Sequence, residues 1–390
     1  MEIKKLIFSP WPYFGKEEID AVTSVLSSGK VNQWTGQEIY SFEKEYADYL
    51  GIKHAIALAN GSVALDLALQ VLNIGPGDEV IVTPRTFVAS SHCIVLKGAT
   101  PVFADVDPDS QNITVESVQK VFTPKTKAII AVHLGGWPCE LKALRDFCNA
   151  HKLFLIEDCA QAHGSKYANL PAGSVGHIAT FSFCQDKILT TGGEGGLLAT
   201  NDSDLWAKAW SFKDHGKDYQ TIFHEKHQGF IWAIKNFGTN YRMTEMQAAI
   251  GRIVLRKLDA WVTKRRQFAY ILTEGFSNIP ALRLTLPPEN IYHSYYKYYA
   301  FIRPEKLKSG WTRGRILESL QQKGIPCSAG SCSEVYLEEA YQKAAYQKSR
   351  LAVAKQLGET ALMFLVHPTL DDSHMHYIVE NMRIVMTEAS

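Results

Sequence analysis

The sequence of 390 residues lacks the features that mark several large classes of protein. Its seven cysteines lie at positions 93, 139, 148, 159, 184, 327 and 332. They form no CxxC pair, which argues against a disulfide framework or a zinc ribbon. No apolar segment approaches the roughly 18 residues that span a bilayer, and the amino-terminal stretch MEIKKLIFSPWPYFG is too weakly apolar for a signal peptide. We therefore expect reduced cysteines, a cytoplasmic location and no membrane partner.

The chain also lacks an excess or a block of charge of either sign. It has 41 basic and 40 acidic side chains and a net charge of +1, so nothing predicts nucleic acid as a partner. No internal repeat, low-complexity segment, metal-ligand pattern or GxxxxGK[ST] phosphate-binding motif occurs. With 46% hydrophobic and 21% charged residues, the composition is typical of a soluble globular protein.

Short apolar runs alternate with helical patterns along the first two thirds of the chain. We predict strands over residues 54–59, 79–84, 101–106, 128–133, 153–158 and 178–183. Helical spacing of apolar residues predicts helices over residues 16–28, 41–50, 62–72 and 87–98. Continuous apolar strands that alternate with helices are typical of a parallel sheet covered on both faces. The predicted fold class is therefore α/β.

The pattern changes after about residue 255. One long helix is predicted over residues 256–276, and the alternating aromatics of HSYYKYYAFIRP predict a strand with one exposed face. Further helices are predicted over residues 312–323, 353–362 and 374–386. We expect two domains, a large α/β domain with the amino-terminal segment over residues 1–255 and a smaller α+β domain over residues 256–390.

Several polar or aromatic residues follow predicted strands, and ligands of open parallel sheets gather at the carboxyl ends of the strands. Asn60, Gly61 and Ser62 open a helix, where free backbone N–H groups can hold a phosphate. The alternative is a plain turn with Ser62 as the helix cap. Phe87, just past VTPRT, could stack on a planar ring or belong to the core.

Asp158 ends the apolar run LFLIED. A carboxylate at such a buried position needs a hydrogen-bonding partner or a cation, and a protonated pyridine nitrogen would serve. Gln161 could reach the same ligand, and His163 lies near in the sequence. The alternative is that Asp158 caps a following helix.

The stretch FSFCQDKILTTGGEGG contains a single lysine, Lys187, which follows Ser182 at the end of a predicted strand. A lysine amine becomes a nucleophile towards a carbonyl when a dry site or a neighbouring positive charge destabilises its ammonium form. The position between a strand end and a glycine-rich turn suits that chemistry. The alternative is a solvated surface lysine.

Five segments carry a resemblance to a known family: ANGSVAL, TPRTFVAS, EDCAQAHG, FSFCQDKILTTGGEGG and GTNYRMTEMQAAI. In order and spacing they resemble the motifs of the fold-type-I sugar aminotransferases that depend on pyridoxal 5'-phosphate (PLP), often called the DegT/StrS family. The resemblance runs from SSGKVNQWTG to FLVHPTL. It implies a large domain with a mixed, mostly parallel sheet between helices, followed by a smaller α+β domain.

The resemblance implies catalytic roles for two residues. Lys187 should hold PLP covalently and then act as acid and base, and Asp158 should keep the pyridine nitrogen protonated. Gln161 would contact the phenolic oxygen of the ring or its neighbourhood, and Phe87 would stack on the ring.

The resemblance also implies a phosphate site and a dimer. Gly61, Ser62 and Ser182 would hold the phosphate. In the family, the residue that matches Asn240 reaches the phosphate of the neighbouring subunit, so a homodimer with shared active sites is expected.

Three neighbouring residues have open or structural interpretations. His163 matches a family position close to the cofactor, and a satisfied structural histidine is an equal alternative. Glu194 is interpreted as a turn residue in preference to a substrate contact. Arg242 is interpreted as a structural ion-pair or capping residue in preference to a substrate clamp.

Two residues depart from the family pattern. Arg85 stands where a small or polar residue is expected, and it could pair with a substrate carboxylate or phosphate or, as we prefer, form a surface salt bridge. Gly135, in HLGG, stands where HLYG is commoner, and the missing tyrosine could enlarge the sugar pocket.

The relatives act mainly on nucleotide-linked keto sugars and use glutamate as the usual amino donor. The form TTGGEGG resembles members that aminate C-4 of 4-keto-6-deoxy sugars better than the GAxGDGG form of C-3 enzymes, and Lys187 argues against the dehydratases, which carry His there. We expect an aminotransferase that makes an amino sugar for a surface polysaccharide or glycan. The alternatives are a C-3 aminotransferase and a non-catalytic PLP-binding regulator, although no DNA-binding domain is visible for the latter.

Overall fold

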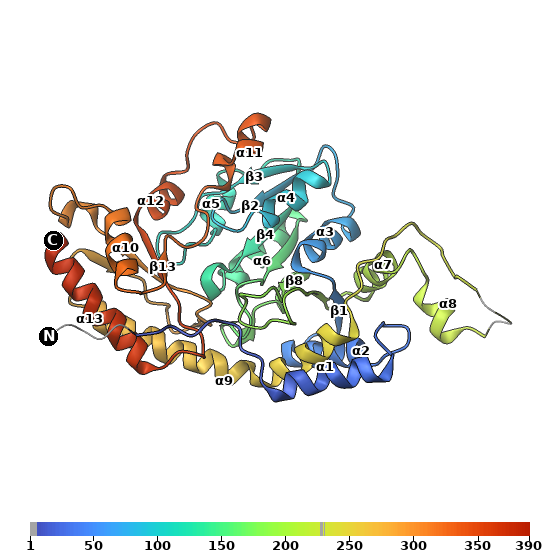
Figure 1. Ribbon diagram of the computed structural model, residues 1–390. Coiled ribbons are helices and arrows are strands. Elements are labelled where there is room, and N and C mark those ends of the chain that lie inside the picture. Colours follow the sequence, from blue (N-terminus) through green and yellow to red (C-terminus); the bar gives the residue numbers. More distant parts are fainter. Residues whose placement is uncertain (1–5, 227–228, 230) are drawn as a thin grey trace.

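In the computed structural model a seven-stranded sheet lies at the centre of the large domain (Figure 1). In spatial order its strands are β1 (His54–Leu58), β9 (Gly196–Thr200), β8 (Ile178–Ser182), β5 (Phe154–Asp158), β4 (Thr126–Val132), β2 (Glu79–Val82) and β3 (Thr100–Phe103). Within this sheet β9 is antiparallel to both of its neighbours, and the other pairs are parallel. The structure describes residues 6–226, 229 and 231–390, so the first five residues of the amino-terminal stretch lie outside it.

Helices cover both faces of this sheet. Successive side chains of a strand point to opposite faces, so each strand contributes apolar side chains to a cluster on either side. Val80 and Val82 of β2 pack in one cluster with α3, α4 and α7, whereas Ile81 packs on the other face with α6. The covering helices are α3 (Gly61–Val71), α4 (Ala89–Leu96) and α7 (Ser203–Lys213) on one side and α2 (Glu38–Leu50), α5 (Val115–Gln119) and α6 (Leu141–His151) on the other. The predicted α/β class and mixed, mostly parallel sheet are confirmed.

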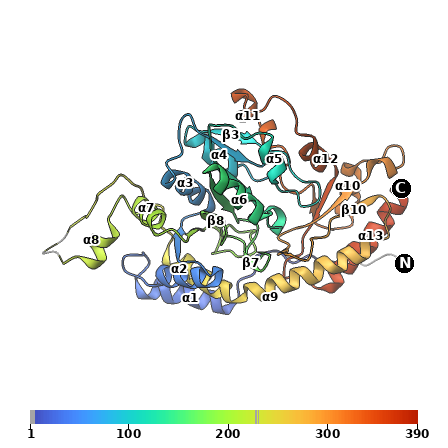
Figure 2. The same ribbon diagram turned by 180° about the vertical axis from the view of Figure 1, so that it is seen from behind.

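The longest helix, α9 (Glu245–Phe276), joins the two parts of the molecule. It begins eleven residues before the predicted start, at a cap where Thr244 Oγ1 accepts a hydrogen bond from the backbone N–H of Gln247. Figures 1 and 2 show it passing from α1 (Lys16–Ser28) and α2 to α13 (Asp372–Ala389). The predicted domain boundary at residue 255 therefore lies inside one helix, and the division at that residue stays a prediction.

A smaller antiparallel sheet follows α9. Its order is β10 (Leu282–Leu284), β12 (Tyr298–Ile302), β14 (Ala361–Phe364) and β13 (Cys327–Ser328). The prediction of one exposed face for the aromatic strand was wrong, because all five residues of β12 are buried. Tyr298 packs against α9 and α13, and Tyr299 packs on the opposite face with α12 (Ala352–Thr360).

The remaining elements are short. They are β6 (Lys166–Tyr167), β7 (Leu170–Pro171), β11 (Ile291–Tyr292), α8 (Tyr219–His224), α10 (Arg313–Gln322) and α11 (Glu339–Ala344). Across the described ranges, no helix combines the length and the apolar character that a membrane crossing requires.

Glu157 anchors the end of β5, one residue before the predicted site residue Asp158. Its fully buried carboxylate accepts hydrogen bonds from the backbone N–H groups of Gly173 and Val175 at 2.7 and 2.8 Å. His133 Nε2 lies 3.0 Å from the same carboxylate, and His133 Nδ1 accepts from a backbone N–H, so Nε2 is the donor. Burial opposes ionisation, yet these hydrogen bonds hold the pKa of Glu157 below its ordinary value.

We predict that Glu157→Gln lowers the free energy of unfolding at pH 7 by roughly 2–4 kcal/mol, because the amide leaves buried donors without acceptors. A depressed pKa in the folded state stabilises the fold above the unfolded-state pKa, and this contribution disappears as the pH falls through the folded-state value. Urea unfolding at pH 7, 5 and 3 should therefore show the difference from wild type shrinking below about pH 4.3.

The matched control is Asp48→Asn, which removes an exposed carboxylate paired with Lys44. It should change stability by less than about 1 kcal/mol. If the two variants are equally stable at pH 7, Glu157 does not anchor the strand end.

Candidate active site

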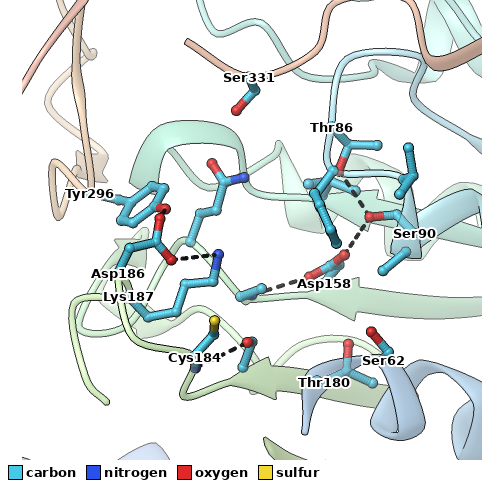
Figure 3. Close-up of a pocket in the computed structure, with 18 of the residues that line it drawn as sticks. Ser62, Thr86, Ser90, Asp158, Thr180, Cys184, Asp186, Lys187, Tyr296 and Ser331 are labelled. Atoms are coloured by element: carbon cyan, nitrogen blue, oxygen red, sulfur yellow. Dashed lines mark hydrogen bonds and ion pairs between the residues drawn. The ribbon is translucent and has the colours of Figure 1, made fainter. Parts of the chain in front are cut away.

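A cavity of about 920 Å³ lies where the carboxyl ends of the central strands face the smaller sheet. All of the predicted site residues except Asn240 line it, and Figure 3 shows Lys187, Asp158 and Ser62 around its walls. The strands that carry them are neighbours in the sheet: β8 ends at Ser182 and β5 ends at Asp158. The sheet topology therefore brings together residues that are distant in the sequence.

The amino end of α3 meets the end of β8 at close range. A Cβ atom on Gly61 would lie 2.6 Å from the Cβ of Ser182, so a glycine is required there. The cap of α3 is Asn60, whose Oδ1 accepts from the N–H of Val63 at 3.0 Å, and the alternative of Ser62 as the cap was wrong. Ser62 and Ser182 thus line a cavity wall at a helix amino terminus, an arrangement that suits a phosphate.

Asp158 is only 5% exposed and lines the cavity. Its Oδ2 accepts from the Ser90 hydroxyl at 2.7 Å, and its Oδ1 accepts from the N–H of Ala160 at 3.1 Å. A turn follows it, so the interpretation as a helix cap was wrong. No cationic side chain in the described part of the chain forms an ion pair with Asp158, which leaves its charge available to a cation in the cavity.

Ser90 and its neighbour Thr86 were missed by the sequence analysis. Their hydroxyl oxygens lie 2.9 Å apart, and the contact continues to Asp158 (Figure 3). Both lie in TPRTFVAS, with Thr86 before α4 and Ser90 in its first turn. Their position past the end of β2 was the available signal.

Lys187 lies inside the cavity with a side chain that is 15% exposed, so the alternative of a solvated surface lysine was wrong. Its Nζ is 3.5 Å from Asp186 Oδ1 and 5.1 Å from the centroid of the Tyr296 ring. The backbone carbonyl of Lys187 accepts from the indole N–H of Trp11 at 2.9 Å. Burial would raise the pKa of Asp186, but Lys187 and the Tyr296 hydroxyl hold it below its ordinary value.

Gln161 and Phe87 occupy other parts of the same cavity. Gln161 is buried, and its Oε1 accepts from the N–H of Gly135 at 2.8 Å. Phe87 is 65% exposed, so the core alternative was wrong. Its ring is available to a planar ligand.

Asn240 lies outside the cavity of its own chain and is exposed. Its Oδ1 accepts from the N–H of Arg242 at 3.2 Å. Arg242 forms an ion pair with the buried Asp214 at 2.7 Å, which confirms its structural interpretation.

Two residues near the lysine make structural contacts. His163 is fully buried between the hydroxyl of Tyr46 and the carbonyl of Ser182, at 2.8 and 2.9 Å, and burial lowers its pKa to about 3. It is therefore neutral near pH 7 and matches the alternative of a satisfied structural histidine. Glu194 lines the cavity, and its backbone carbonyl accepts from the Thr191 hydroxyl at 2.6 Å within the turn.

The two departures from the family pattern both lie near Tyr299, and the preferred interpretation of Arg85 was wrong. Arg85 is 0% exposed and donates from Nε to Gln111 at 2.9 Å, with no acidic partner among the described residues, so no surface salt bridge forms. Burial lowers the pKa of Arg85. A Cβ on Gly135 would lie 3.2 Å from the Tyr299 ring, so this ring already fills the space beside the glycine.

Comparison with known proteins assigns the chain to a family. Residues 12–383 match the model of the DegT/DnrJ/EryC1/StrS aminotransferase family. The chain belongs to this family. The resemblance found in the motifs is thereby confirmed, and the protein is an enzyme of the aminotransferase class.

The relatives of this family member include sugar aminotransferases. The chain is 32% identical to dTDP-4-dehydro-2,3,6-trideoxy-D-glucose 4-aminotransferase of Saccharopolyspora spinosa. The match extends over 376 residues, which are 95% of this chain and 94% of the relative. An aminotransferase structure from Psychrobacter cryohalolentis superposes with a TM-score of 0.96 at 49% identity, covering 98% and 99% of the two chains. The PLP form of the candidate sugar aminotransferase Spr1654 of Streptococcus pneumoniae superposes with a TM-score of 0.86 at 25% identity, covering 98% and 99%.

PLP is the cofactor of this family, and the residues of the cavity fit its chemistry. The buried carboxylate of Asp158, which has no ion pair within the described part of the chain, suits a protonated ring nitrogen. The helix amino terminus at Gly61 suits the phosphate, and the amine of Lys187 suits the aldehyde. When bound, PLP supplies an electron sink for the reacting carbon.

Lys187→Ala is expected to bind PLP without a covalent link, because it removes the amine that suits the aldehyde. Turnover should fall by at least about 10³-fold. Borohydride reduction followed by mass spectrometry of peptides measures the link directly. The control is Lys297→Ala, which removes the other lysine that lines the cavity and should keep the link at Lys187. A reducible link at another residue in Lys187→Ala would refute the assignment.

Asp158→Asn is expected to retain PLP but to lose about 10²–10³-fold in kcat, because a neutral amide stabilises a protonated ring nitrogen poorly. Ser90→Ala removes one hydrogen bond from the same carboxylate and should have a smaller effect. Steady-state kinetics with PLP in excess distinguishes the two. Turnover of Asp158→Asn close to that of wild type would contradict the role.

Proposed function

We propose that the protein transfers an amino group from glutamate to a nucleotide-linked keto sugar, a 4-keto-6-deoxy sugar in preference to a 3-keto sugar. The observation that carries the proposal is that the amine of Lys187 lines one cavity with the carboxylate of Asp158, which forms no ion pair among the described residues. The name of the Saccharopolyspora relative, a 4-aminotransferase of a dTDP-linked sugar, supports the C-4 position. The TTGGEGG segment supports the same choice.

The side chains divide the work of this reaction. Lys187 would hold PLP and then act as the acid and base that moves a proton in a 1,3-shift, and Asp158 would keep the ring nitrogen charged. Gly61 and Ser62 at the start of α3, together with Ser182 at the end of β8, would bind the phosphate through N–H and hydroxyl groups. In the same arrangement Phe87 would cover one face of the ring and Gln161 would contact its phenolic oxygen. The product would serve as an amino sugar for a surface polysaccharide or glycan.

A homodimer with shared active sites belongs to the same proposal. Asn240 is exposed and does not line the cavity of its own chain, which suits a contact with the phosphate in the partner's site. The nearby Phe237 is 100% exposed, and Ile234 is also exposed. Figures 1 and 2 show α8 extended away from the body of the molecule. Apolar side chains on such an extension favour burial against a second copy.

A cytoplasmic location is also proposed. All seven cysteines are free, and four of them are fully enclosed in the large domain, at positions 93, 139, 148 and 159. A protein with free thiols and no disulfide suits a reducing compartment.

We predict that glutamate converts the PLP-loaded enzyme to the amine form of the cofactor, and that a nucleotide-linked 4-keto-6-deoxy sugar reverses the change. Absorbance of the cofactor follows both half-reactions, and NMR of the product identifies the aminated carbon. A panel of 3-keto and 4-keto sugars should give a kcat/KM at least about tenfold higher for the 4-keto members, a difference of about 1.4 kcal/mol.

Lys187→Ala is the control, because its cofactor should remain unchanged with glutamate. Preference for 3-keto sugars would favour the C-3 alternative. A spectrum that stays constant with every amino donor would exclude transamination and favour a passive binder of PLP.

A further inference from the structure

A second lysine, Lys297, lines the cavity beside Lys187. Its Nζ lies 4.6 Å from the centroid of the Tyr296 ring, and Lys187 Nζ lies 5.1 Å from the same centroid. Two amines therefore share one aromatic ring inside the cavity. The sequence analysis assigned no role to Lys297, which falls within HSYYKYYAFIRP.

The position of Lys297 is fixed by its backbone. Its N–H donates to the carbonyl of Gly135 at 3.4 Å, and the N–H of Gly135 donates to Gln161 Oε1 at 2.8 Å. The start of β12 is thus tied to the central part of the cavity wall. From this anchored point Lys297 lines the cavity.

The ammonium of Lys297 has no carboxylate of its own. Among the described residues it forms no ion pair and no side-chain hydrogen bond, and it lies over the Tyr296 ring. The nearby carboxylate of Asp186 is occupied, because Lys187 lies 3.5 Å away and the Tyr296 hydroxyl donates to it. The buried guanidinium of Arg265, which donates to the carbonyl of Tyr296 at 3.2 Å, adds further positive charge.

This excess of positive charge suits an anion. Burial lowers the pKa of Lys297 to about 8, with Asp186 acting in the opposite direction and Arg265 and Lys187 reinforcing the decrease. The side chain is therefore still mostly protonated at pH 7. An ammonium in a partly dry cavity with no protein counter-ion gains most from a carboxylate that enters with a substrate.

We propose that Lys297 binds a carboxylate of the amino donor, an inference that rests on the proposed function. The amine of the donor must reach the place that the Lys187 amine occupies, and both lysines contact one ring. In an amino acid such as glutamate the carboxylates are only a few bonds from the amine. In a nucleotide-linked sugar, the sugar ring separates the diphosphate from the keto carbon, so the donor is the better match.

The test uses the PLP-loaded enzyme and the substitution Lys297→Met, which keeps the length of the side chain and removes the charge. Binding of glutarate, a dicarboxylate without an amine, is measured by calorimetry, and conversion of the cofactor is measured with glutamate and with alanine. We expect glutarate to bind at least tenfold more weakly and the KM for glutamate to rise by at least tenfold. The KM for the keto sugar should stay within twofold of wild type.

Two further variants serve as controls. Lys297→Arg keeps the charge and should restore glutarate binding to within about threefold of wild type. Lys166→Met removes an exposed lysine outside the cavity, whose Nζ lies 5.9 Å from the centroid of the Tyr292 ring. It should change neither glutarate binding nor the KM for glutamate. If Lys297→Met fails to fold, as judged by its melting temperature, Lys297→Gln takes its place.

The outcomes separate this inference from the proposed function. If Lys297→Met weakens conversion of the cofactor with both glutamate and alanine, Lys297 binds the α-carboxylate. If the variant weakens conversion with glutamate alone, Lys297 binds the distal carboxylate. Unchanged glutarate and glutamate binding, or a change in the KM of the keto sugar alone, overturns the inference. If glutamate never converts the wild-type cofactor while glutarate binding still depends on Lys297, the proposed donor fails and the carboxylate site stands.

Discussion

The carboxylate of Asp158 is buried at the carboxyl end of β5 and forms no ion pair with any cationic side chain of the described residues. Its two hydrogen bonds, from Ser90 and from the N–H of Ala160, orient the charge without neutralising it. Isolated buried charges are costly, so such a site persists when a ligand supplies the opposite charge. The protonated ring of PLP would supply that charge, and the other predicted site residues of the large domain line the same cavity, except Asn240.

The rest of the structure supports this carboxylate in two ways. The neighbouring Glu157 ties the end of β5 to the segment before β8 through buried hydrogen bonds, which fixes the edge of the sheet. The smaller sheet and the segment before β12 close the cavity from the other side. There the Tyr296 hydroxyl donates to Asp186, and the Tyr299 ring lies beside Gly135. The continuous helix α9 packs with both parts and so holds the two walls together. The large domain supplies the chemistry that suits the cofactor, and the smaller one supplies the wall on which the donor is proposed to bind.

Much of the site could be predicted because its residues follow strands in a regular way. Gly61, Asp158 and Ser182 each stand at or just past the end of an apolar run, and the ends of parallel strands meet at one edge. The environments of Arg85 and Gly135 could not be predicted in this way, because both depend on Tyr299 in a distant strand. A local pattern indicates which way a side chain faces, but not which distant element fills the space before it.

The sequence by itself determined the fold class, the family and the residues that suit PLP, because periodicity and motif spacing are local properties of the chain. Only the tertiary structure decided that Arg85 is buried with no acidic partner among the described residues, that Phe87 is exposed and lines the cavity, and that Lys297 shares a ring with Lys187. These properties arise where the smaller sheet meets the larger one. The charge environment and exposure of a side chain depend on all the neighbours that packing brings to it, and those neighbours come from segments remote in the sequence.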